Sequence, residues 1–190
     1  MSGSIERVTA VVLCGGEARR FGADKVSALL AGHTLLDHVL GDLSQAWEVI
    51  CVGPERITQR PARWVRESPP GGGPLAGVLA GALAARDEVL VVLAGDTPGA
   101  GSLAERLVEA LADHPQAAAA VAKSPDGQPN PLLAAYRRTS VLALIGDSGH
   151  DRPARLLLDL EHVTLAVSAA AAQDVDTQED LSRIEREGWR

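Results

Sequence analysis

One stretch, residues 8–25, constrains this chain more than any other. It starts with apolar, mostly β-branched residues, and residues 7–14 predict a buried strand because consecutive apolar residues suit a parallel strand covered on both faces. The run breaks at Gly15 and Gly16 and continues as a basic segment that ends at Lys25. Glycines let backbone N–H groups approach a phosphate closely, and nearby cations neutralise it. We therefore interpret the stretch as a strand and a loop that holds a nucleoside triphosphate.

The composition sets the class of protein. The chain has 190 residues, 46% of them apolar and 23% charged, so it can bury a large core, and we expect one domain over residues 1–190. Its net charge of −7 argues against a general nucleic-acid surface, which needs a basic patch. No apolar run approaches the ~18 residues of a membrane span, and residues 1–8 lack the apolar core of a signal peptide. We expect a cytoplasmic protein with no membrane or nucleic-acid partner, and its two cysteines suggest no disulfide framework.

Strand and helix patterns alternate along the chain, which predicts an α/β sandwich with a mostly parallel sheet. Ligands of such folds bind beyond the carboxyl ends of the strands, where the 15–25 loop and Asp96 both lie. We expect N-caps at Thr34, Ser102 and Thr177, the last two in capping boxes with residues 105 and 180. The expected strands are 7–14, 48–53, 64–67, 88–94, 117–122 and 162–168, with 131–138 a strand or a strand-to-helix transition. The expected helices follow residue 34 and cover 75–86, 102–113, 139–146, 153–160 and 178–187.

Two glycines lie four residues apart on one face of the expected 75–86 helix. Each of them, Gly77 and Gly81, costs roughly 1 kcal/mol relative to alanine in a helix interior. Their spacing predicts a close approach by a neighbouring backbone or by a ligand, and packing is the favoured explanation.

Two common phosphate loops do not fit the first stretch. A Walker A loop ends in Gly-Lys-Ser/Thr, whereas Lys25 follows Asp24 and precedes Val26. A dinucleotide fingerprint needs Gly-x-Gly-x-x-Gly, which the glycines at 15, 16 and 22 do not supply.

The segment Leu13–Lys25, LCGGEARRFGADK, closely resembles the nucleotide-binding signature of the MobA-like nucleotidyltransferases, roughly L-A-G-G-x-S/A-x-R-M-G-x-D-K. Residues 73–77, GPLAG, and 94–98, AGDTP, look like two further segments of that family. Residues 130–132, NPL, and 174–181, DVDTQEDL, match its later segments. The motifs span nearly the whole chain in the family's order.

The resemblance implies a Rossmann-like, three-layer nucleotidyltransferase fold of the nucleotide-diphospho-sugar transferase type, with a mostly parallel mixed sheet. It also implies transfer of a nucleoside monophosphate to a phosphorylated acceptor with release of pyrophosphate. In the molybdenum cofactor guanylyltransferases, which the chain resembles most, the donor is GTP, the acceptor is molybdopterin carrying molybdenum, and Mg²⁺ is required. Weak contact with other molybdenum cofactor proteins is a further expectation.

The resemblance also suggests roles for individual residues. Lys25 would bind the phosphates, and Asp96 would bind both Mg²⁺ and the nucleotide. The chemistry of the reaction, independently of the resemblance, adds Arg19 beside Lys25 for charge neutralisation and Asp176 as a candidate second metal ligand. Glu67 stands where the family usually has aspartate. The expected nucleotide-binding residues are Leu13, Cys14, Gly15, Gly16, Lys25, Glu67, Pro74, Leu75, Gly77 and Asp96. These roles suit the reaction, because attack on an α-phosphorus builds negative charge on the phosphoryl oxygens and an anionic acceptor phosphate needs no strong base.

For several of these residues, a purely structural role is the alternative to a functional one. Asp96 and Asp176 are alternatively a loop cap and a helix cap, and either Arg19 or Arg20 is the phosphate contact. Cys14 is interpreted as a small packed residue. The segment 123–131 is either a plain hairpin or part of the acceptor pocket.

Three functions compete at this stage. The first is a guanylyltransferase. The second is a molybdenum cofactor cytidylyltransferase, suggested by residues 174–177, or a relative with another acceptor. The third is a nucleotide-binding regulatory protein without turnover. Base choice is expected to depend on backbone groups around residues 13–16 and 74–77.

Overall fold

The computed structural model describes residues 7–15, 24–147, 149 and 151–189. The strands are β1 (Val8–Leu13), β2 (Leu29–Leu30), β3 (His33–Thr34), β4 (Glu48–Val52), β5 (Arg63–Val65), β6 (Val89–Ala94), β7 (Ala119–Lys123), β8 (Pro129–Arg137) and β9 (His162–Ala166). The α-helices are α1 (Leu35–Gly41), α2 (Gly73–Ala84), α3 (Ala104–Ala112), α4 (Arg138–Ile145) and α5 (Gln178–Arg186). Short 3₁₀ helices cover Lys25–Ser27 (η1), Ala100–Leu103 (η2), Ala154–Asp159 (η3) and Ala170–Ala172 (η4).

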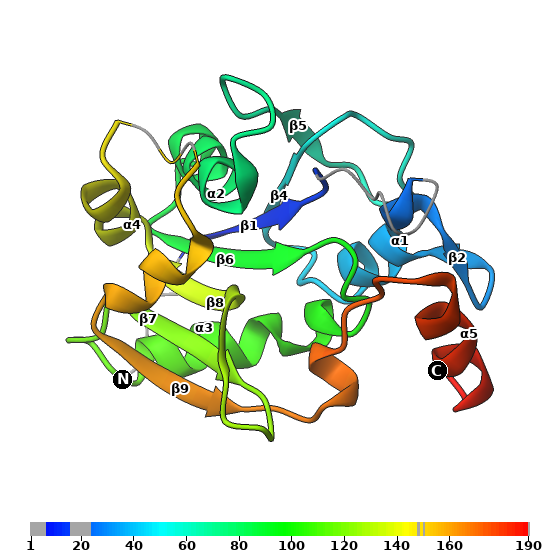
Figure 1. Ribbon diagram of the computed structural model, residues 1–190. Helices are drawn as coiled ribbons and strands as arrows, with labels where there is room; N and C mark the ends of the chain where they lie inside the picture. The colour runs from blue at the N-terminus through cyan, green and yellow to red at the C-terminus, as the bar shows by residue number, and fades with distance from the viewer. Residues whose placement is uncertain (1–6, 16–23, 148, 150, 190) are drawn as a thin grey trace.

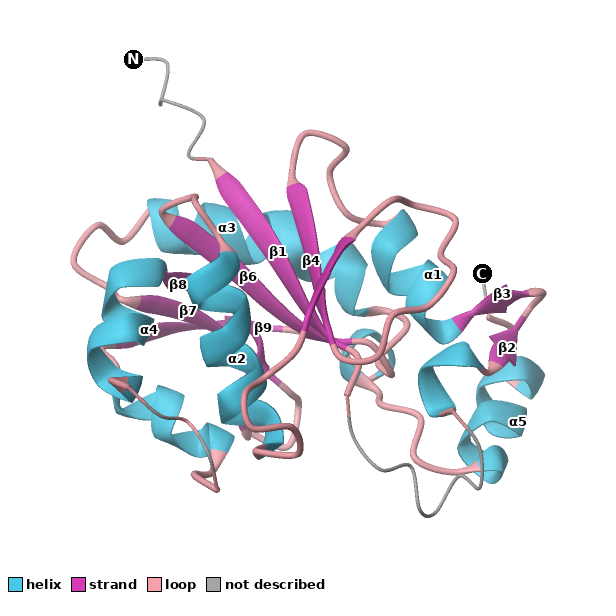
Figure 2. Cartoon of the chain, turned by 90° about the horizontal axis from the view of Figure 1, so that it is seen from above, coloured by secondary structure: helices cyan, strands magenta, loops and turns pink. Residues whose placement is uncertain are grey.

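In the described part of the chain, seven strands form one sheet in the order β5-β4-β1-β6-β8-β7-β9. β1 lies at its centre and pairs in parallel with both β4 and β6. β8 is antiparallel to both of its neighbours, whereas β9 is again parallel to β7. The mostly parallel mixed sheet expected from the sequence is confirmed, and β1, β4 and β6 end at the same edge, as Figure 2 shows.

Helices cover the sheet on both faces and make three layers (Figure 1). On one face α1, η2 and α3 pack over Ala10, Val12 and Leu93. On the other face α2 and α4 pack over Val11 and Val92. Consecutive residues of β1 therefore enter opposite layers, which is why this strand is apolar at nearly every position.

The α2 glycines let this helix lie close to β1. A Cβ placed on Gly81 would lie 2.3 Å from Cγ1 of Val11, and one placed on Gly77 would lie 3.2 Å from Cδ2 of Leu13. The packing explanation is therefore correct for Gly81, whereas Gly77 lies both against Leu13 and in the lining of the cavity described below.

The last helix belongs to a separate small core. Leu181 and Ile184 of α5 pack with Val175 against Leu30 and Leu35, beside the β2–β3 hairpin. This packing brings the segment just before α5 back to the carboxyl edge of the sheet.

Most predicted elements are present within a few residues of their predicted bounds. The cap at Thr34 is confirmed, as is the Thr177–Asp180 capping box. The cap at Ser102 is wrong, because Ser102 lies inside η2 and its hydroxyl donates to the carbonyl of Gly99; α3 begins at Ala104. The predicted 153–160 helix is the 3₁₀ segment η3. Within the described residues, no helix is both long enough and apolar enough to span a membrane.

Candidate active site

A cavity of about 560 Å³ opens at the carboxyl edge of the sheet, between β1 and α2. This volume lies within the usual range of small-molecule sites. The lining residues are Leu13, Gly15, Val52, Glu67, Gly71, Gly73, Pro74, Gly77, Ala94, Asp96 and Leu132. Six of the expected nucleotide-binding residues are thus brought together: Leu13, Gly15, Glu67, Pro74, Gly77 and Asp96.

Two other expected nucleotide contacts face the protein interior. Leu75 is fully buried in the core under α2. The Cys14 side chain is 2% exposed, and its N–H donates to the carbonyl of Val52. A hydrogen bond with Cys51, together with burial, raises the pKa of the Cys14 thiol, as expected of a packed thiol. A nucleotide role for Cys14 or Leu75 remains a prediction that concerns their backbone. Gly16, Arg19 and Arg20 lie outside the described residues.

Lys25 joins two carboxylates at the edge of this cavity. Its Nζ lies 2.5 Å from Oδ2 of Asp96 and 2.8 Å from Oδ1 of Asp176. The Lys25 side chain is 17% exposed, and that of Asp96 is 23% exposed. Burial opposes the charge on Lys25, but the bonds to Asp176 and Asp96 outweigh it and raise the pKa of the lysine. Lys25 is therefore a fixed cation between two carboxylates.

The C-terminal segment 174–176 carries the second of these carboxylates. The N–H of Val175 donates to the carbonyl of Asp96 at 3.0 Å, which ties this segment to the end of β6. Thr177 is the N-cap of α5, so the alternative interpretation of Asp176 as this cap is wrong. Burial, together with the charge of nearby Asp176, raises the pKa of Asp174. The site therefore gathers negative charge from the end of β6 and from the segment before α5, which are distant in sequence.

Asp96 and Asp176 suit a hard divalent cation. Their oxygens already converge on one positive group, Nζ of Lys25, and Mg²⁺ prefers one or two carboxylates completed by substrate phosphates and water. Among the described residues, no cluster of three or more His, Cys, Asp or Glu side chains is arranged to hold a metal ion. The donor set thus fits a metal that arrives together with phosphate oxygens, because two protein carboxylates alone leave most of its coordination open.

Two further residues shape the surroundings of the cavity. Oε1 of Glu67 accepts from the N–H of Gly71 at 3.1 Å, so this carboxylate stabilises the glycine-rich turn before α2. Asp24 forms a two-pronged ion pair with Arg56, with distances of 2.6 and 2.7 Å. Arg56 is not recognisable from the sequence, because a single arginine in a polar loop has no distinctive pattern.

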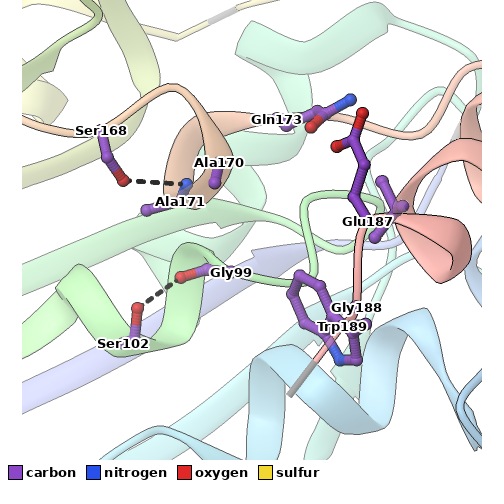
Figure 3. A pocket seen from close by; sticks show the side chains of 10 residues that line it. Gly99, Ser102, Ser168, Ala170, Ala171, Gln173, Glu187, Gly188 and Trp189 are labelled. Atoms are coloured by element: carbon purple, nitrogen blue, oxygen red, sulfur yellow. Dashed lines mark hydrogen bonds between the residues drawn. The ribbon is translucent and has the colours of Figure 1, made fainter.

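A second cavity, of about 490 Å³, lies between α5 and residues 168–173 (Figure 3). Both of its serine hydroxyls already form hydrogen bonds: Ser102 donates to the carbonyl of Gly99, and Ser168 accepts from the N–H of Ala171. None of its lining side chains is basic, and Glu187 adds negative charge. This cavity does not suit a triphosphate, whereas the cavity beside β1 gathers six of the expected nucleotide-binding residues and is the candidate nucleotide site.

Comparison with known proteins places this arrangement in a family. The model of the MobA-like NTP transferase domain matches residues 10–165, which include most of β1, all of α2, and Asp96. The chain belongs to this family. It is therefore a nucleotidyltransferase, and the match covers all of the named residues that line the candidate nucleotide cavity.

Curated relatives carry a more specific name. A protein of Chloroflexus aggregans named "Probable molybdenum cofactor guanylyltransferase" is 32% identical over 146 residues, which are 72% of this chain and 69% of that protein. "Molybdenum cofactor guanylyltransferase" of Acidiphilium cryptum is 40% identical over 111 residues, 52% of this chain and 55% of that protein. A probable one from Deinococcus radiodurans is 28% identical over 95% of both chains.

Solved structures support the fold. Molybdopterin-guanine dinucleotide biosynthesis protein A from Archaeoglobus fulgidus has a TM-score of 0.72 at 23% identity, with 94% of this chain and 97% of that chain covered. A Mycobacterium tuberculosis protein solved in complex with manganese has a TM-score of 0.70 at 19% identity, with 95% and 98% covered. The Rossmann-like nucleotidyltransferase fold predicted from the motifs is confirmed.

Proposed function

We propose that this protein transfers GMP from GTP to the terminal phosphate of a molybdopterin-type acceptor. The observation that carries this proposal is the pairing of Lys25 with Asp96 and Asp176 beside a nucleotide-sized cavity. The names of the curated relatives support GTP as the donor. In the reaction an oxygen of the acceptor phosphate bonds to the α-phosphorus, and the bond from that phosphorus to the bridging oxygen breaks. Pyrophosphate leaves with the electron pair.

The chain's own groups stabilise the charge that develops in this step. Gly15 and Gly77 line the cavity without side chains, so a nucleotide can approach the backbone there. Lys25 neutralises the phosphoryl oxygens once a nucleotide is present. Asp96 and Asp176 would hold Mg²⁺, which when bound supplies further positive charge at the phosphates. The acceptor phosphate is already anionic, so no residue needs to remove a proton from it.

The test is incubation with GTP, Mg²⁺ and molybdenum-loaded molybdopterin, with pyrophosphate and the dinucleotide cofactor as products. The expected result is multiple turnovers, lost in Asp96→Ala and retained in Asp113→Ala, a control at an exposed aspartate that follows α3. Absence of both products with Mg²⁺ or Mn²⁺ would refute the proposal. Binding of GTP without formation of either product would instead favour the regulatory alternative.

The cytidylyltransferase alternative rests on residues 174–177, DVDT, which resemble that branch. Against it stand the Asp24-Lys25 ending of the first loop and the names of the relatives. Thermal shifts with GTP, CTP, ATP and UTP in the presence of Mg²⁺ separate the two functions, because a ligand at 100 times its Kd stabilises the folded state by about 2.7 kcal/mol. A large shift with CTP and none with GTP would reject GTP as the donor.

A further inference from the structure

The segment Gly53–Arg56, directly after β4, contacts the described residues at the two ends of the 15–25 loop, which is called the nucleotide loop below. At the first end, Gly53 lies against the backbone of Cys14 and Gly15. A Cβ placed on Gly53 would lie 2.8 Å from the carbonyl carbon of Cys14 and from the nitrogen of Gly15. The φ angle of Gly53, 145°, is one that glycine alone adopts readily. The segment thus begins in close contact with the residues where the loop leaves β1.

At the other end, Arg56 holds Asp24. Its Nε donates to Oδ2 at 2.6 Å and its Nη2 donates to Oδ1 at 2.7 Å, the two-pronged geometry that only a guanidinium provides. Nη1 donates to the carbonyl of Pro54 at 2.6 Å, so all three nitrogens of the guanidinium are engaged within the protein. The Arg56 side chain is 17% exposed. This geometry is more constrained than that of an ordinary surface ion pair.

Asp24 transmits this constraint to Lys25. It is the residue directly before η1, and its carbonyl accepts from the N–H of Ser27 at 3.1 Å. The Ser27 hydroxyl also donates to the Asp24 carboxylate, at 2.7 Å. Side chain and backbone of Asp24 are therefore both fixed, and the backbone of Lys25 starts from a defined position.

We propose that Arg56 is a positioning residue for the nucleotidyl transfer: through Asp24 it fixes the start of η1 and directs Lys25 toward the triphosphate. This inference rests on the proposed function, because it assigns Lys25 to the phosphates. Arg56 itself touches no substrate atom. Its contribution is geometric, and misplacement of a charged group by about 1 Å can cost as much as 10²-fold in rate.

The test compares Arg56→Gln with Arg63→Gln. Arg63 is a matched control, because it also follows β4 and pairs with a carboxylate, Glu48, at 3.1 Å, but it lies on β5 and does not line the cavity. GTP binding is measured by calorimetry without acceptor, and kcat and KM are measured with it. For Arg56→Gln we expect GTP to bind about 10-fold more weakly and kcat/KM to fall about 10- to 50-fold, with values for Arg63→Gln close to wild type.

A double-mutant cycle shows whether Arg56 acts through Asp24. Asp24→Asn should weaken GTP binding to a similar extent, and Arg56→Gln should then add little to it. Arg56→Lys keeps the positive charge but loses the two-point hydrogen bonding to Asp24. We therefore expect it to bind GTP more tightly than Arg56→Gln but more weakly than wild type. Full additivity in the cycle would mean that Arg56 contacts the phosphates directly, which overturns the inference. Equal GTP affinity in the two arginine variants would also overturn it.

Two further outcomes separate an effect on folding from an effect on function. If Arg56→Gln lowers the melting temperature strongly, GTP binding by Arg56→Lys and by Asp24→Asn is compared with that of wild type instead. If wild-type protein neither binds nor turns over GTP, the proposed function fails, and this result is distinct from a failure of Arg56 alone.

Discussion

Replacing Lys25 by methionine should strengthen the binding of a divalent cation in the absence of nucleotide. In the structure Nζ of Lys25 stands between the Asp96 and Asp176 oxygens, 2.5 and 2.8 Å away. A cation bound by both carboxylates would occupy the same space, so Lys25 has to leave first. Methionine has a similar length but no charge, and it leaves both carboxylates without their partner.

The size of the effect follows from the two ion pairs. The three side chains are 17%, 23% and 55% exposed, so each pair is screened by solvent and contributes about 0.5–1 kcal/mol. Both together cost about 1–2 kcal/mol to break, which corresponds to roughly 5- to 30-fold in a dissociation constant. The carboxylate oxygens are at most about 5.3 Å apart, the sum of the two distances, so their mutual repulsion in the variant further favours a cation.

The assay is titration of nucleotide-free protein with Mn²⁺, followed by electron paramagnetic resonance and by competition with Mg²⁺. Lys25→Met should bind Mn²⁺ roughly 10-fold more tightly than wild type, and Lys25→Arg, which keeps the cation, should not. GTP binding by Lys25→Met should fall, since the phosphates lose a positive partner. Mn²⁺ affinity that is unchanged or weaker in Lys25→Met would refute the idea that Lys25 occupies the cation position.

Three other changes have defined outcomes. Asp96→Asn should lower kcat/KM by roughly 10²–10³ with folding retained, as measured by steady-state kinetics and circular dichroism; an unfolded variant would show a structural role instead. Gly81→Ala should destabilise the fold by about 1–3 kcal/mol in urea denaturation, because its Cβ would overlap Val11, and an unchanged midpoint would contradict the α2–β1 contact. The hydrogen bond from Arg56 lowers the pKa of Asp24, so their pair adds stability above pH ~4, the pKa of an unfolded aspartate, and loses it as pH falls through the folded pKa. Melting temperatures of wild type and Arg56→Gln should therefore differ at neutral pH and converge below about pH 4, and a constant difference would contradict this pairing.

Periodicity and turn residues were sufficient to predict most of the fold. β1, β4 and β6 are nearly continuous apolar runs because both faces are buried, and such runs are visible in the sequence. The Ser102 cap failed for a local reason: its sequence pattern fits a capping box, but the chain enters α3 through the 3₁₀ turn η2. Competition between two short-range hydrogen-bond patterns is not encoded in residue spacing.

The site residues that could be predicted from the sequence are those motif residues whose side chains have distinctive chemistry. Lys25 and Asp96 are charged groups beside strand ends, and the structure brings them together. Arg56 and Gly53 were missed because their importance comes from contacts made across the fold. Leu75 has a side chain buried in the core, although a motif places it near the nucleotide. A motif does not distinguish residues that touch a ligand from residues that support them.

The bond between Lys25 and Asp176 joins positions 151 residues apart in sequence. A ribosome makes the first loop and β6 well before segment 174–176, and long-range contacts form late in folding. A nascent chain that has not reached this segment has one of the two carboxylates, and its lysine is paired on one side alone. The order of synthesis therefore delays assembly of the cation site until the sheet has been made, so that partly made chains cannot complete it.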